Sequence, residues 1–163
     1  MPVTVRQILA LPVLDDARLL AGEAGLERRV ASVTVGEVPD IAEWLSGGEL
    51  VLSTLFAVKG DPERQREFCK RVMMADAAAL FVKTTRFVES LPADIIELAE
   101  KRKFPIVEVP QSLRWTRLMQ DATEVIINRQ ASQLEQSQSI HRDLLGIVIR
   151  GGGWVELADE ASR

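Results

Sequence analysis

The sequence predicts an α/β fold, with a mainly parallel sheet, helices on both faces of that sheet and a long C-terminal helix. Three runs, at 49–54, 79–83 and 106–109, are short and almost continuously hydrophobic. Such runs are typical of parallel strands that are covered on both faces. The segments between them are each long enough for a crossover helix. Residues 112–145 then contain neither glycine nor proline, which favours one long helix.

The N-terminal part is expected to form one helix and two strands. Residues 4–10 carry apolar side chains at helical spacing, with Thr4 as the N-cap, and Pro12 ends this helix. Residues 17–22 form a short apolar run that a glycine closes, and residues 30–38 are rich in β-branched side chains. Both segments are therefore predicted to be strands.

Three helices are predicted around the apolar strands. Asp40 stands where it can cap a short helix that Gly47-Gly48 stops. Asp61 is followed by proline, a strong signal for the start of a second helix. Residues 93–103 form the third, with basic residues at the C-terminal end where they suit the helix dipole.

These elements divide the chain into three expected parts. Residues 1–111 form a compact α/β domain, and residues 112–150 form a linking and dimerising helix. Residues 151–163 begin an apolar and acidic segment that we interpret as the truncated start of a following domain. The polar stretch "NRQASQLEQSQS" cannot be buried all round, so the long helix is expected to pair with a second copy. A weak coiled-coil seam at three-four spacing is predicted from Ile127, Ala131, Leu134, His141, Leu144 and Val148.

Composition narrows the class of protein. The formal net charge is −4, from 24 acids against 20 bases, whereas a nucleic-acid-binding domain normally carries a basic face. Cys69 is the single cysteine, so it forms no internal disulfide, and its helical surroundings indicate a packing thiol. The chain shows no secretory hydrophobic region and no apolar run of membrane-spanning length, so a cytoplasmic location is expected.

Motifs for catalysis are missing from the sequence. It contains no Gly-x-Ser-x-Gly, no P-loop, no His-Glu-x-x-His and no Cys-x-x-Cys. His141 is the single histidine, and with one cysteine the chain offers no metal-binding cluster. We therefore expect no catalytic residues, no metal, no cofactor and no enzyme activity.

A binding site is expected at the carboxyl ends of the strands, where ligands gather in parallel α/β sheets. Acidic, hydroxyl and basic side chains follow the strand ends, and together they would suit a small polar ligand. These candidate ligand-binding residues are Glu37, Asp40, Ser53, Thr54, Lys83, Thr84 and Arg86.

Chain routing offers a second interpretation of the same residues. The acids can shape a turn and cap a helix, the hydroxyls can satisfy loop backbone, and the basic residues can simply be solvated. Trp44 is interpreted as a packing anchor, and Gly47-Gly48 as the stop of a helix before a strand.

The combination of "LAGEAGLERRV", "EVPDIAEWLSGGELVLST" and "FPIVEVP" resembles the N-terminal domain of the PucR (purine-catabolism regulator) family of bacterial transcription factors. The similarity covers roughly residues 3–120. The motif positions that it marks in this chain are Glu37, Asp40, Trp44, Gly47, Gly48, Glu49, Ser53, Thr54 and Lys83. The family often has Thr-Thr-Gly where this chain has Ser53-Thr54-Leu55, which puts close approach of a ligand to the backbone in doubt.

The resemblance implies a cytoplasmic regulator with a sensory N-terminal domain, a middle region and a C-terminal helix-turn-helix that reads DNA. DNA would then be contacted only by a helix-turn-helix that this chain does not contain. We expect an effector-sensing and dimerising domain that controls genes for small-molecule catabolism of the purine type. The alternative is a ligand-free module for dimerisation and protein–protein interaction. Calorimetry with a panel of metabolites distinguishes the two.

Overall fold

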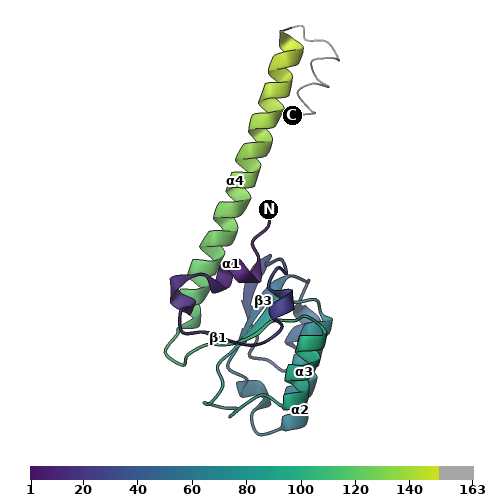
Figure 1. The fold of residues 1–163 in the computed structure, drawn as a ribbon, viewed down its shortest axis with the longest axis vertical. Coiled ribbons are helices and arrows are strands. Elements are labelled where there is room, and N and C mark those ends of the chain that lie inside the picture. Colours follow the sequence, from purple (N-terminus) through teal and green to yellow (C-terminus); the bar gives the residue numbers. More distant parts are fainter. Residues whose placement is uncertain (151–163) are drawn as a thin grey trace. The chain divides into compact units, whose positions relative to one another are not determined.

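The structure, a computed structural model, describes residues 1–150, and its compact unit, Pro2–Ile126, is built around a five-stranded sheet (Figure 1). The strand order is β1-β5-β4-β3-β2, in which β2 to β5 run parallel and β1 pairs antiparallel with β5. The predicted α/β fold with a mainly parallel sheet is confirmed. The strand bounds are Arg18–Ala21 (β1), Ser32–Val35 (β2), Glu49–Ser53 (β3), Ala79–Val82 (β4) and Ile106–Glu108 (β5).

The α-helices are α1 (Val5–Leu9), α2 (Pro62–Met74), α3 (Ala93–Lys101) and α4 (Trp115–Ile149). Two of them begin at the caps that the sequence indicates. Thr4 forms a capping box with Gln7. The Asp61 side chain accepts hydrogen bonds from the backbone N–H groups of the second and third residues of α2, at 3.1 and 3.2 Å.

The short helix predicted after Asp40 is a 3₁₀ turn, Ile41–Trp44, rather than an α-helix. Asp40 stands at its N-cap position, but the Asp40 side chain makes no capping hydrogen bond, so the prediction of Asp40 as a capping side chain is wrong. The prediction of Trp44 as a packing anchor is also wrong, because the Trp44 side chain is 74% exposed. The apolar side chain that this turn packs into the core is Ile41 instead.

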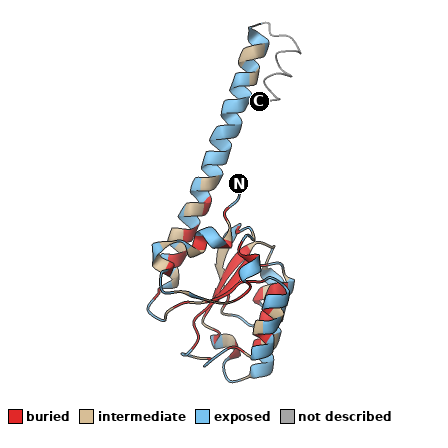
Figure 2. Ribbon diagram, in the orientation of Figure 1, coloured by how far each residue is buried: buried red, intermediate tan, exposed pale blue. Residues whose placement is uncertain are grey.

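Helices cover both faces of the sheet, as predicted (Figure 2). On one face α2 and α3 pack on β3, β4 and β5, and Cys69 of α2 is completely buried there. On the other face α1 and the first turns of α4 pack on the alternate side chains of the same strands. Every residue of β3 and β4 is buried, which explains why their sequences read as continuous apolar runs.

The long helix begins at Trp115, three residues after its predicted start at Ser112. Its first part belongs to the compact unit, which extends from Pro2 to Ile126 and buries Leu118 and Ala122 of α4. The expected division of the chain at residues 111 and 150 stays a prediction, and the expected further domain at 151–163 lies outside the described residues. No helix within residues 1–150 has the length and hydrophobicity that a membrane span requires.

The remainder of α4 is exposed along most of its length. Among the six residues of the predicted seam, only Leu144 is partly buried. The large exposed apolar side chains here are Ile127, Leu134, Ile140, Leu145, Val148 and Ile149. Their number shows that this part of α4 has apolar surface that the described chain leaves uncovered.

Candidate functional site

The carboxyl ends of β2, β3 and β4 lie side by side, so four of the predicted ligand residues come together there: Glu37, Ser53, Thr54 and Lys83. Glu37 follows β2, and its carboxylate faces the end of β3. Its Oε1 accepts a hydrogen bond from the Thr54 backbone N–H at 2.6 Å, and its Oε2 accepts one from Thr54 Oγ1 at 2.6 Å. Glu37 and Thr54 therefore satisfy each other and tie the ends of two strands together.

Ser53 also has a hydrogen-bond partner for its hydroxyl within the chain. Its side chain is buried, and its Oγ accepts a hydrogen bond from the Leu55 backbone N–H at 3.0 Å. Leu55 has a left-handed backbone, with φ of 63°, and its side chain is buried. A glycine would adopt this conformation without strain, whereas here a leucine adopts it and packs its side chain into the core.

Lys83 follows β4 directly at this edge. Its side chain is buried, and its Nζ lies 4.4 Å from the centroid of the Trp115 ring, in a cation–π contact. Burial lowers the pKa of Lys83 and the nearby charge of Arg86 lowers it further, while Glu37 opposes both effects. Trp115 is the first residue of α4, so this contact joins the strand edge to the start of the long helix.

The other predicted site residues are placed differently. Thr84 is buried, and its carbonyl oxygen accepts a hydrogen bond from the Gln111 side chain. Arg86 is exposed and lies 4.9 Å from the centroid of the Phe87 ring. Asp40 is exposed. At this edge the cationic groups of Lys83 and Arg86 remain for a ligand. The side chains of Glu37, Ser53 and Thr54 are already engaged in hydrogen bonds within the chain.

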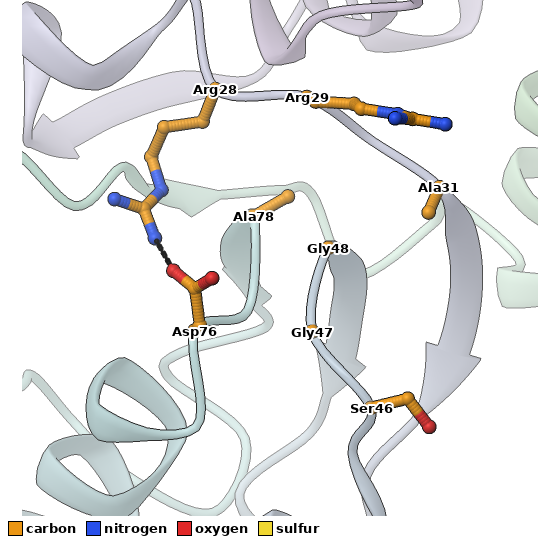
Figure 3. Close-up of a pocket in the computed structure, with 8 residues that line it drawn as sticks. All are labelled: Arg28, Arg29, Ala31, Ser46, Gly47, Gly48, Asp76 and Ala78. Carbon is orange, nitrogen blue, oxygen red and sulfur yellow. Dashed lines mark hydrogen bonds and ion pairs between the residues drawn. The ribbon is translucent and has the colours of Figure 1, made fainter.

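Sequence reasoning did not predict a site at the opposite edge, where a cleft of about 520 Å³ lies before the strands begin. That volume is within the range of small-molecule sites. The lining residues are Arg28, Arg29, Ala31, Ser46, Gly47, Gly48, Asp76 and Ala78 (Figure 3). Gly47-Gly48 is the sequence feature that marks this cleft, but the pattern by itself predicts only the stop of a helix.

Hydrogen bonds hold the three loops around this cleft together. Arg28 Nη2 donates to Asp76 Oδ1 at 3.1 Å and to the Ala77 carbonyl at 2.9 Å. The backbone N–H of Gly48 donates to the Asp76 carbonyl at 2.9 Å. The carboxylate of Glu49, which is buried, accepts from the backbone N–H groups of Ser46 and Gly47 at 2.6 and 2.9 Å. The loop amides are thus paired within the chain.

The similarity to known proteins covers most of the compact unit. The family model of the purine catabolism regulatory protein-like family, PucR, matches residues 7–126. The chain belongs to the PucR family. The predicted resemblance is confirmed, and the match includes both edges of the sheet and the first turns of α4.

Two curated relatives and one solved structure are similar to this PucR-family chain. The purine catabolism regulatory protein of Bacillus subtilis (strain 168) is 29% identical over 160 residues, which are 98% of this chain and 30% of that protein. The transcriptional activator PmfR of Paenarthrobacter nicotinovorans is 21% identical over 140 residues, which are 86% of this chain and 30% of that protein. The chain thus spans about 30% of the length of these relatives.

The solved structure contains the CBS and DRTGG domains of the regulatory region of Clostridium perfringens pyrophosphatase, complexed with the activator diadenosine tetraphosphate. It is 19% identical, with a TM-score of 0.47, and the match covers 71% of this chain and 48% of that one.

Proposed function

We propose that this chain is the regulatory part of a cytoplasmic transcriptional regulator that controls genes for small-molecule catabolism of the purine type. The support is its membership of the PucR family and its similarity to a purine catabolism regulatory protein and to a transcriptional activator. In this proposal the compact unit binds an effector, α4 joins two copies of the chain, and DNA is contacted by a helix-turn-helix elsewhere in the full regulator.

The contact between Lys83 and Trp115 is the observation that carries the sensing part of this proposal. An effector with an anionic or carbonyl oxygen would meet Lys83 and Arg86 at the carboxyl edge, because Glu37, Ser53 and Thr54 already have partners. A ligand that draws Lys83 towards itself weakens the cation–π contact with the first residue of α4. Effector binding and the position of α4 are then coupled through one side chain.

Calorimetry on the whole chain with a panel of metabolites, purine-pathway compounds first, tests this sensing role. We expect one compound to bind, Lys83→Ala to weaken it at least tenfold, and binding to change the fluorescence of Trp115. Arg102→Ala is the matched control, because Arg102 is exposed and lies at the end of α3. If the Lys83 variant binds the compound as tightly as the wild-type chain does, the effector does not bind at the carboxyl edge. Absence of any binder would favour the ligand-free module instead.

Dimerisation through α4 is the second part of the proposal. Ile127, Leu134, His141 and Val148 recur every seven residues, and the first, second and fourth of them expose large apolar side chains. In water such a stripe is stabilised when a second helix covers it.

Sedimentation equilibrium of the whole chain tests the pairing of α4. We expect a dimer that Leu134→Lys converts to a monomer, because the substitution places a charge in the seam. Ser139→Lys is the matched control, since position 139 falls on the face opposite the seven-residue stripe, and its dimer is expected to persist. A monomeric wild-type chain at high concentration would contradict the proposed pairing.

A further inference from the structure

Both signs of charge border the cleft at the amino edge of the sheet. Arg28 and Arg29 come from the loop before β2, and Asp76 comes from the loop before β4 (Figure 3). In Figure 3 the Arg29 side chain extends over Ala31, away from the paired side chains of Arg28 and Asp76. The cleft therefore has an ion pair on one side and a separate guanidinium on the other.

Arg29 is the group that can attract an anion. Its side chain is exposed, and it takes part in none of the ion pairs within residues 1–150. A guanidinium presents a planar fork of donors that matches a carboxylate in a bidentate manner. Arg28, in contrast, is already held by Asp76 and by the Ala77 carbonyl.

Asp76 offers an acceptor on the same cleft. Its Oδ1 receives the hydrogen bond from Arg28, which leaves Oδ2 as the other oxygen of the carboxylate. A Cβ atom added to Gly47 would stand 3.9 Å from Oδ2, at ordinary van der Waals distance, so this oxygen and Gly47 are neighbours on the cleft lining. The Asp76 side chain is 87% exposed, so an N–H group of a ligand in the cleft can reach Oδ2 and donate to it.

The hollow itself arises from small residues held in fixed conformations. Gly47 and Gly48 have φ of 103° and 82°, in the left-handed region that glycine adopts readily. Ala31 and Ala78 add only methyl groups to the lining. The hydrogen bonds that join the three loops fix this shape before any ligand arrives, which lowers the entropy lost on binding.

We propose that this cleft binds a small carboxylate that also carries an N–H donor. The carboxylate lies on the Arg29 guanidinium, and the N–H group donates to Oδ2 of Asp76. This site is separate from the carboxyl edge and does not depend on Lys83, so either site can fail without the other.

The test follows the backbone amide signals of Gly47 and Gly48 by ¹⁵N–¹H NMR while three related compounds are added to the whole chain. Succinamate has both a carboxylate and an amide, succinate has only carboxylates, and succinamide has only amides. We expect saturable shifts with succinamate at a dissociation constant on the order of 10 mM, because exposed polar contacts contribute only about 0.2–1 kcal/mol each. Succinate binds several-fold more weakly, and succinamide more weakly still.

Two substitutions assign the two ends of the ligand. Arg29→Gln is expected to weaken succinamate several-fold, because an exposed ion pair contributes about 0.2–1 kcal/mol, whereas Arg102→Gln, on an exposed arginine outside the cleft, leaves it unchanged. Asp76→Asn keeps an acceptor for Arg28 and a residue that tolerates the left-handed backbone, with φ of 60° at this position. It removes the preference for succinamate over succinate.

A third variant keeps the proposal testable if the charged residues prove to affect folding. Ala31→Leu fills the lining from an exposed position and is expected to abolish the shifts with all three compounds. The proposal is overturned if succinamate gives no saturable shifts at Gly47 and Gly48. It is equally overturned if the Arg29 and Arg102 variants bind succinamate alike.

Discussion

Replacing Glu37 with alanine tests whether its carboxylate holds the ends of β2 and β3 together. The substitution removes the acceptor of two hydrogen bonds from Thr54, both at 2.6 Å. A hydrogen bond to a charged group contributes about 1.5–3 kcal/mol, so two give about 3–6 kcal/mol as an upper limit. Glu37 is partly exposed, and water replaces some of what is lost, so we expect a loss of about 2 kcal/mol.

Urea denaturation of the whole chain measures this loss. With a denaturant slope of about 2 kcal/mol/M, the unfolding midpoint of Glu37→Ala falls by about 1 M. Glu37→Gln keeps an oxygen for the Thr54 backbone N–H and an amide that can donate to its hydroxyl, so it loses only about half as much. Glu43→Ala is the control, because Glu43 is exposed and its nearest cation is 3.8 Å away. The reasoning is refuted if Glu37→Ala shifts the midpoint no more than Glu43→Ala, or if Gln is as damaging as Ala.

Three further outcomes follow from single side chains. Burial raises the pKa of the Cys69 thiol to about 12, so a thiol reagent at pH 8 should label Cys69 only as fast as the chain unfolds. Immediate labelling without denaturant would contradict the burial of Cys69. Asp61→Ala removes the cap of α2 and should cost about 1 kcal/mol in the same urea assay, whereas Asp61→Asn should cost less. The pKa of Lys83 is lower in the folded chain than its ordinary value of 10.5, so the unfolded chain binds the Lys83 proton more tightly. The free energy of unfolding should therefore rise with pH between the lowered pKa and 10.5. Lys83→Met should remove that rise, and an unchanged pH profile would show that Lys83 is not desolvated.

The sequence predicted the centre of the sheet well because strands that are buried on both faces have continuous apolar sequences. Each residue of β3 and β4 is buried, so hardly a polar residue interrupts them, and Asp61 caps α2, the α-helix between them. The antiparallel direction of β1 could not be predicted in this way, because the direction of a strand depends on how it pairs, here with β5, and not on its amino-acid composition.

The two sheet edges were predictable to different degrees. The parallel order placed Glu37 and Thr54 at one edge, but the sequence could not show that the two side chains would satisfy each other. The amino-edge cleft depends on the left-handed glycines and on side chains too small to fill the space, contributed by three separate loops. Loop conformations of this kind depend on tertiary contacts, so no local sequence pattern predicts them.

The strength of the Lys83–Trp115 contact limits how far an effector could act on α4 through it. A cation–π contact contributes about 0.5 kcal/mol at an exposed site and about 2 kcal/mol when desolvated. Lys83 is buried, so the upper figure applies, and it corresponds to a change in the equilibrium of about 30-fold. A ligand that takes Lys83 from the indole is therefore expected to bias α4 by about this factor through that one side chain. A measured coupling well above 30-fold would therefore need a second connection. The hydrogen bond from Gln111 to the Thr84 carbonyl is one such connection, because it ties the segment before α4 to the end of β4.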